Sequence, residues 1–327
     1  PQGKLSHITH LDNHEIKAVR LLYFDSEQRL WIGTRNPLYR YRDEELQEFA
    51  VAGIDDFANT LSVVEDSENN IWFGTGTGLV QLADAKVVSE TTRDGLPARS
   101  VHSIMLDQNK TRWVGAMGGG VQATKADGTT RLYTKEDGLL DDFTINMDLD
   151  SKNNVWIGYY GKGIAKIEDG KITNYYNEVP GLSSRYLNLD IGPDDQLWLV
   201  TLRNGVLKLE NDKLVPAINS SLGLITAILP IEGGKIWAAT DQAIGLWNYT
   251  SKRWEQKYIL DKEHHKVADT ILRDEQGNIW IIRDGAELNK VDLKNNRVET
   301  FSFPQKVGIL SDGGIIHKNT IWINFRN

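Results

Sequence analysis

One tryptophan recurs at a nearly constant interval along the chain, and this repeat limits the fold more than any other feature. It stands in short apolar segments such as LWIGT, IWFGT and VWIGY. Eight of the ten tryptophans fall on this grid, at intervals of 39 to 43 residues: Trp31, Trp72, Trp113, Trp156, Trp198, Trp237, Trp280 and Trp322. A chain of 327 residues with this repeat is predicted to contain about eight copies of one small structural unit.

Each unit contains four short apolar runs separated by turn residues. In the third unit these runs are VHSIMLD (101–107), TRWVGA (111–116), GGGVQATK (118–125) and TTRLYTK (129–135). Runs of this length bounded by Gly, Asn, Asp or Lys are typical of hairpin-linked strands. Four antiparallel strands per unit, repeated around a ring, define a β-propeller. We therefore predict an all-β fold, a single β-propeller of four-stranded antiparallel blades, in which the repeated tryptophans are buried anchors between successive sheets.

Two further residue types recur at a fixed distance from the repeated tryptophan. An aspartate precedes it by six residues in five units: Asp25, Asp66, Asp107, Asp150 and Asp274. Because an aspartate in a turn can accept hydrogen bonds from the turn N–H groups, we predict a structural role for these carboxylates. A glycine follows the tryptophan by two residues in the first four units: Gly33, Gly74, Gly115 and Gly158. A glycine within a strand predicts close approach of a neighbouring tryptophan or backbone.

The two ends of the chain suggest how the ring closes. The N-terminal segment KLSHITHL (4–11) resembles the fourth strand of a unit, and the last unit, around Trp322, supplies only two strands after seven complete units. Joining them gives an eighth, three-stranded blade, which leaves no free sheet edge. We predict eight blades over residues 1–327, with the N-terminal strand closing the last blade. The alternative is a seven-bladed ring whose last two strands belong to a structure beyond residue 327. We expect the propeller of residues 1–327 to be a fragment of a larger receptor.

Composition excludes several classes of function. The 45 acidic residues outnumber the 37 basic ones, which argues against a nucleic-acid partner. The absence of cysteine excludes thiol catalysis, and no apolar run of about 18 residues spans a membrane. No HExxH or nucleotide-binding motif occurs, and the adjacent His264 and His265 fit a solvated loop. We predict no cofactor, no metal site and no catalytic residue.

Candidate ligand-binding residues come from the loops. In a propeller, the loops between second and third strands and the loops between blades share one face. At these positions the chain carries Arg35, Arg99, Tyr159, Tyr160, Arg185, Tyr186, Arg203, Asn204 and Arg283. Arginine pairs with carboxylates and tyrosine rings stack on flat ligands, so the set fits an anionic sugar or another acidic small molecule. The alternative is a set of ordinary loop residues paired with neighbouring acids.

The units resemble the propeller repeat of two-component regulators. The segments that carry the resemblance are HITHLDNHEIKAVRLLYFD (7–25), GTGTGLV (74–80), RDGLPARSVHSIMLD (93–107), EDGLLDDF (136–143) and VPGLSSRY (179–186). The resemblance implies a periplasmic or otherwise extracytoplasmic sensor domain of a bacterial two-component or diguanylate cyclase receptor. Such a domain binds a small molecule or oligosaccharide at the rim of the central channel without catalysis. The resemblance also leaves open that the domain forms a homodimer.

Two alternatives belong to other classes of function. Streptogramin-inactivating lyases are propellers with a similar aromatic-anchored strand, so a lyase acting on a polysaccharide or antibiotic is the second hypothesis. Histidine and carboxylates gathered at the channel would favour it. The third hypothesis is a protein-interaction scaffold, in which Trp254 is exposed on an outer strand.

Overall fold

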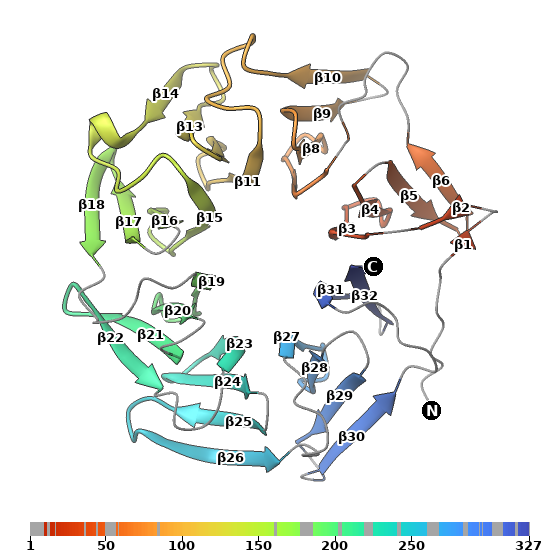
Figure 1. The fold of residues 1–327 in the computed structure, drawn as a ribbon, viewed down its shortest axis with the longest axis vertical. Coiled ribbons are helices and arrows are strands. Elements are labelled where there is room, and N and C mark those ends of the chain that lie inside the picture. Colours follow the sequence, from red (N-terminus) through yellow and green to blue (C-terminus); the bar gives the residue numbers. More distant parts are fainter. Residues whose placement is uncertain are drawn as a thin grey trace.

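The protein is a ring of antiparallel β-sheets around a central axis in the computed structural model (Figure 1). The structure describes residues 10–11, 14–16, 18–35, 37–43, 45–49, 57, 59–83, 86–159, 162–176, 186–201, 205–218, 225–240, 243–259, 268–283, 287–293, 295, 297–302, 310–317 and 320–326. Seven of the sheets have four strands, and each strand pairs with the next one along the chain. The β-propeller of four-stranded antiparallel blades is therefore confirmed.

Each blade starts near the axis and ends on the outer wall (Figure 1). The first, innermost strands are β3 (Leu21–Phe24), β7 (Ser62–Glu65), β11 (Val101–Leu106), β15 (Thr144–Leu149), β19 (Tyr186–Ile191), β23 (Ile225–Ile231) and β27 (Ala268–Arg273). The second strands, which carry the repeated tryptophan, are β4 (Leu30–Gly33), β8 (Ile71–Gly74), β12 (Arg112–Ala116), β16 (Val155–Tyr159), β20 (Leu197–Thr201), β24 (Lys235–Thr240) and β28 (Ile279–Arg283).

The two outer strands of each blade complete the wall. The third strands are β5 (Leu38–Arg42), β9 (Leu79–Ala83), β13 (Gly120–Thr124), β17 (Gly163–Glu168), β21 (Gly205–Glu210), β25 (Ala243–Asn248) and β29 (Glu287–Asp292). The fourth strands are β6 (Glu45–Phe49), β10 (Lys86–Glu90), β14 (Thr130–Tyr133), β18 (Lys171–Tyr176), β22 (Lys213–Ile218), β26 (Arg253–Ile259) and β30 (Arg297–Ser302). The described residues contain no α-helix, and one 3₁₀ turn, η1 (Lys135–Asp137), precedes blade 4.

The prediction of eight blades is wrong: the structure has seven four-stranded blades, the number given by the alternative. The last two strands lie within the ring, which the alternative did not expect. The last unit is a hairpin of two strands, β31 (Leu310–His317) and β32 (Thr320–Arg326), which contacts β27 on one side and β3 on the other (Figure 1). The predicted closing strand falls mostly outside the described residues. Its described end, β1 (His10–Leu11), pairs with β2 (His14–Glu15) and not with β32. A short local hairpin therefore replaces the long-range pairing that an eighth blade requires.

The repeated tryptophans anchor the blades as predicted. Those at positions 31, 113, 156, 198 and 237 are buried, those at 72 and 280 are half-buried, and the side chain at 322 lies outside the described residues. Trp31 shows the packing between sheets, since its ring meets Phe73 of the next blade at a centroid distance of 5.2 Å. Contacts of this kind form a separate hydrophobic cluster between each pair of successive four-stranded sheets, from blades 1 and 2 to blades 6 and 7.

The aspartates also have the predicted structural role. In all five units, the indole N–H of the tryptophan donates to the carboxylate six residues earlier, over 2.8 to 3.0 Å. The same carboxylates accept backbone N–H groups of their own turns, as Asp107 does from Asn109 and Thr111 over 2.8 Å. The aspartate thus fixes the turn and satisfies a buried indole donor at the same time.

The strand glycines mark close contacts, although with other partners than predicted. A Cβ at Gly74 would lie 2.2 Å from Ser62 Oγ and 2.7 Å from Val101 Cγ1 of the next blade. At Gly115 the nearest atom is Thr144 Oγ1 of the next blade, at 2.9 Å. The neighbours are therefore side chains of the innermost strands, not tryptophans, because blades converge most tightly near the axis.

Candidate functional site

Two classes of loop meet on one face of the ring, which we call the loop face: those between second and third strands, and those between blades. Backbone hydrogen bonds tie one class to the other. The Asn59 N–H donates to the Arg35 carbonyl over 2.7 Å, and the Met117 N–H donates to the Ser100 carbonyl over 3.0 Å. The loops of the first three blades therefore form one continuous surface, as the propeller interpretation predicts.

The predicted ligand-binding residues occupy different environments. Arg35 and Arg99 are exposed on the loop face, in loops of different blades. Tyr159 and Arg283 are buried at the ends of β16 and β28. Tyr186 begins β19, with its side chain outside the described residues. Tyr160, Arg185, Arg203 and Asn204 also lie outside the described residues.

The two buried side chains are held by the ring itself. Burial raises the pKa of Tyr159 well above its usual range, and the carboxylates of Asp141 and Asp142 raise it further, so its hydroxyl stays neutral. The Arg283 guanidinium lies 3.5 Å from the Glu287 carboxylate on the paired strand β29. Contact with a ligand from either position requires the neighbouring loops to leave the side chain accessible.

A repeated motif fixes the loops that enter blades 3 and 4. Both contain the pattern T-x-x-D-G-L, at residues 91–96 and 134–139. In each, the aspartate accepts the N–H and the hydroxyl of the threonine over 2.9 Å, and these bonds lower the pKa of Asp94 and Asp137. The glycine has a φ of 103° or 108°, and the leucine is buried. The motif therefore builds a preformed loop.

These loops present an exposed cluster that we call the rim cluster, made of Arg99, Met117 and Phe143. Met117 is 47% exposed and Phe143 is 52% exposed, and the two residues form an isolated antiparallel bridge. The residue after Arg99 accepts the N–H of Met117, so all three belong to adjoining loops. Arg99 forms no ion pair with another described residue. An exposed aromatic ring, a thioether and a guanidinium without an ion pair in the described part of the chain thus share one part of the rim.

Sequence reasoning identified Arg99 but omitted Met117 and Phe143, because it selected arginine and tyrosine among the loop residues. The signal was present: both residues occupy the loop positions that define this face, and large apolar side chains in exposed loops are unusual. Their exposure depends on the tertiary structure, since an apolar loop residue can equally well fold into the core.

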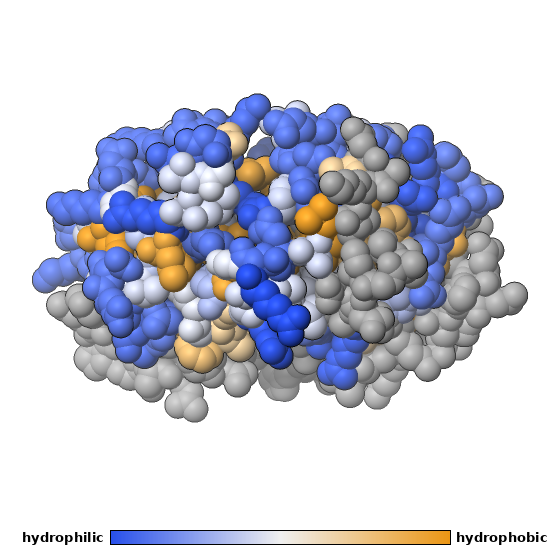
Figure 2. Space-filling model, turned by 90° about the horizontal axis from the view of Figure 1, so that it is seen from above, coloured by the Kyte–Doolittle hydropathy of each residue, from blue (hydrophilic) through white to orange (hydrophobic). Residues whose placement is uncertain are grey.

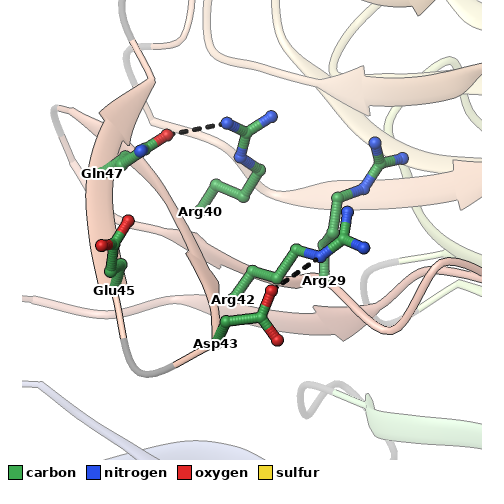
Figure 3. Close-up of a pocket in the computed structure, with 6 residues that line it drawn as sticks. All are labelled: Arg29, Arg40, Arg42, Asp43, Glu45 and Gln47. Carbon is green, nitrogen blue, oxygen red and sulfur yellow. Dashed lines mark hydrogen bonds and ion pairs between the residues drawn. The ribbon is translucent and has the colours of Figure 1, made fainter.

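A charged pocket of about 170 Å³ lies on blade 1 (Figure 3). Its lining residues are Arg29, Arg40, Arg42, Asp43, Glu45 and Gln47. Arg40 donates to Gln47 Oε1 over 2.8 Å, Arg42 Nε lies 3.3 Å from Asp43 Oδ2, and Arg29 pairs with two carboxylates of its own turn. Because each arginine already has a partner in the same blade, the pocket supports a structural role.

The outer wall gives the scaffold hypothesis little support. Trp254 lies on β26, half-buried, and its ring meets Trp247 edge-on at a centroid distance of 5.3 Å. Gly245 leaves the space for this ring, since a Cβ there would lie 2.5 Å from it. The prediction of an exposed Trp254 is therefore wrong. On the side of the ring in Figure 2, apolar atoms form small groups among hydrophilic ones.

Within the described part of the chain, no group of three or more His, Asp or Glu side chains is placed to hold a metal ion. The residues His264 and His265 lie outside that part. No helix of the described chain is long and apolar enough to cross a membrane.

Comparison with known proteins supports the fold alone. No protein-family model matches the chain, and no curated protein matches it. The designed protein Ika8 has a TM-score of 0.70 at 11% identity, with 96% of this chain and 94% of that chain covered. Virginiamycin B lyase from Staphylococcus aureus, in a catalytically inactive form with quinupristin, has a TM-score of 0.58 at 17% identity, with 93% and 90% covered.

The similar structures also include extracellular domains attributed to two-component systems. One, BT3049 from B. thetaiotaomicron, has a TM-score of 0.46 at 16% identity, with 93% of this chain covered. The chain spans 48% of that domain's length. At these identities the likeness extends to the propeller architecture and not to a shared ligand.

Proposed function

We propose that this chain is a non-catalytic ligand-binding propeller domain, with its ligand on the loop face at the rim of the central channel. The observation that carries the proposal is the rim cluster. Large apolar side chains that remain exposed on a preformed surface indicate a binding site. The T-x-x-D-G-L loops hold the cluster in place, so little conformational entropy is lost on binding.

The chemistry of the rim cluster favours an acidic ligand with an apolar face. The Arg99 guanidinium can form a bidentate pair with a carboxylate. The Phe143 ring and the Met117 thioether offer an apolar platform on which a sugar ring can lie. An oligosaccharide that contains uronic acid has both features. Arg35, Tyr160, Arg185, Tyr186, Arg203 and Asn204 stay predicted ligand contacts on the same face.

We place this domain outside the cytoplasmic membrane, as the sensor part of a bacterial two-component or diguanylate cyclase receptor. The support is the resemblance of residues 7–25, 74–80, 93–107 and 136–143 to the two-component regulator repeat. A signal passes only if the ligand binds two states of the receptor with different affinity. A homodimer whose geometry changes on binding meets that requirement.

The test is a thermal-shift screen against uronate-containing and neutral oligosaccharides. A ligand at 100 times its dissociation constant stabilises the domain by about 2.7 kcal/mol, which is readily detected. Arg99→Ala and Phe143→Ala are then expected to weaken binding about tenfold or more, without changing the melting temperature of the free protein. Arg253→Ala and Leu132→Ala are matched controls, because these residues are exposed on the outer strands β26 and β14.

Each other result points elsewhere. A ligand that is consumed during incubation overturns the non-catalytic proposal and favours the lyase. A ligand whose affinity is the same in the rim variants and in their controls places binding away from the rim cluster. If no oligosaccharide stabilises the domain, the proposed ligand class is wrong and the protein-scaffold hypothesis is favoured instead.

A further inference from the structure

The face opposite the loop face, which we call the turn face, carries a repeated link between blades. Ser26 in the β3–β4 turn donates its N–H to Glu65 Oε2 over 2.7 Å and its hydroxyl to Glu65 Oε1 over 2.5 Å, across to blade 2. Ser151 in the β15–β16 turn donates its N–H and hydroxyl to the two carboxylate oxygens of Asp195 in blade 5. In both places one serine turn binds one carboxylate in the same two-pronged way.

A third link of this kind joins blades 3 and 4. The N–H of Gln108 donates to Asn153 Oδ1 over 2.8 Å. The acceptors Asn153 and Asp195 occupy the same turn position, three residues after the start of the turn, with φ values of 66° and 58°. Blade 3 has Lys110 at this position, with a φ of 62°. Lysine has no acceptor atom, so it cannot complete a link to the preceding blade.

The link between blades 2 and 3 is therefore missing. Ser67 stands in the β7–β8 turn where Ser26 and Ser151 stand in theirs. Among the described residues, no hydrogen bond reaches its N–H or its hydroxyl. A two-donor site that holds a carboxylate at two other places in the ring is thus left open here, and the cation Lys110 stands at the turn position that supplies the acceptor in blades 4 and 5.

A cleft of about 530 Å³ opens at this gap. Ser67, Trp72, Leu106, Lys110 and Lys125 are among its lining residues. The Arg112 guanidinium lies 4.1 Å from the Trp72 ring centroid and forms an ion pair with Glu90, so its positive charge is already compensated. Lys110 and Lys125 are exposed, and neither forms an ion pair with another described residue. The volume suits a small organic molecule.

We propose that this cleft binds a small carboxylic acid with an apolar body. Its carboxylate accepts the N–H and the hydroxyl of Ser67, as Glu65 and Asp195 do from their serines, and Lys110 and Lys125 supply the positive charge. Its apolar part lies against Trp72 and Leu106. The ligand thereby completes the missing link between blades 2 and 3.

The acidic residues of the cleft do not compete for these donors. Glu65, Asp66 and Asp107 accept hydrogen bonds from Ser26, from Trp72 and from Trp113 respectively. Glu68 is exposed and opposes an anion, so its neutral variant Glu68→Gln is expected to bind more tightly. Because two exposed lysines supply the attraction, added salt is expected to weaken binding.

The experiment measures binding of 3-phenylpropionate and of its neutral counterpart 3-phenylpropionamide to the whole chain by isothermal titration calorimetry. The acid is expected to bind about tenfold or more tightly than the amide, since a charged acceptor forms the stronger hydrogen bonds. Lys110→Asp restores an acceptor facing Ser67, so it is expected to abolish binding of the acid and to raise the melting temperature. Lys252→Asp makes the same charge change at another exposed lysine with a positive φ, in the β25–β26 turn of blade 6, and is expected to leave both unchanged.

Equal affinity for acid and amide overturns the proposal, as does unaltered binding of the acid to Lys110→Asp or Ser67→Ala. Failure of the wild-type chain to bind the acid overturns it as well. Phe143→Ala, on the opposite face, separates this site from the rim cluster, because it is expected to leave affinity for 3-phenylpropionate unchanged. A loss in that variant would assign the acid to the loop face.

Discussion

Asp150 tests how the blades are anchored, because one buried carboxylate satisfies four donors. Its Oδ1 accepts the backbone N–H groups of Lys152 and Asn154 over 3.1 and 2.9 Å. Its Oδ2 accepts the side-chain N–H groups of Asn154 and Trp156, each over 2.9 Å. Asparagine has the same size and shape, but it replaces one acceptor oxygen with an NH₂ group. In Asp150→Asn the new NH₂ group therefore faces two N–H donors and cannot accept a hydrogen bond from either.

The expected loss follows from the donors left unpaired. Each buried donor without a partner costs about 1–3 kcal/mol, and the remaining hydrogen bonds lose their charge assistance. We expect Asp150→Asn to lower the free energy of unfolding by about 3–5 kcal/mol. Asp150→Ala leaves all four donors unpaired, whereas asparagine keeps one acceptor oxygen for two of them, so the alanine variant is expected to lose at least as much stability as the asparagine variant.

Urea unfolding followed by tryptophan fluorescence measures this loss, provided that the m value is unchanged. Asp127→Asn is the matched control, since Asp127 lies in an exposed turn and accepts the N–H of Thr129 over 2.8 Å. That control is expected to cost less than about 1 kcal/mol. If Asp150→Asn also costs less than about 1 kcal/mol, the carboxylate is not what holds the indole and the turn, and the anchoring argument fails.

Three further predictions are tested by the same urea unfolding measurements. Glycine stands at position 192, where five other units have the aspartate, and the indole N–H of the buried Trp198 has no hydrogen-bond partner among the described residues. Gly192→Asp is therefore expected to stabilise the protein by about 1 kcal/mol; a loss of stability would mean that the 3.0–3.1 Å contacts of the new Cβ dominate. Burial raises the pKa of Asp66 and Asp274, but hydrogen bonds outweigh it and leave each pKa below its usual value. Their stabilisation is therefore complete at neutral pH and disappears as the pH falls from about 4 through the folded pKa values; in Asp66→Asn this acid loss should be smaller. Trp113→Ala is expected to cost about 3–5 kcal/mol, and a cost below about 1 kcal/mol would contradict burial of the anchor.

The local parts of the fold were predictable because their partners lie close in the chain. The tryptophan and its aspartate are six residues apart, so the spacing alone suggests that one turn can join them. The four-stranded unit was predictable for the same reason, since each strand pairs with the next one along the chain. The strand glycines showed that something approaches closely, but not which atoms, because those atoms belong partly to the next blade.

The number of blades was not predictable in this way. The N-terminal segment has the composition of a fourth strand, but whether it reaches β32 depends on how the two ends of the ring meet. In the structure, His10 and Leu11 pair with the residues that follow them. A local hairpin has a smaller loop-closure cost than a pairing across the whole chain, and no sequence pattern reports which of the two is available.

The candidate site was predictable only in part. Loop positions placed Arg35 and Arg99 correctly on the loop face, since antiparallel topology decides which loops share a face. The same reasoning placed Tyr159 and Arg283 among ligand contacts, although both are buried. Residue type and loop position do not report burial, which depends on what the neighbouring blade places over the side chain.

The sequence by itself determined the blade, its anchors and its turn chemistry, because these arise from contacts within one unit of about 42 residues. Tertiary structure alone decided how the ring closes, which loop side chains reach solvent, and where the link at Ser67 is missing. These features depend on partners in different blades, such as the serine links that span 39 and 44 positions. The separation of such partners is set by the packing and twist of whole sheets, which no local pattern encodes.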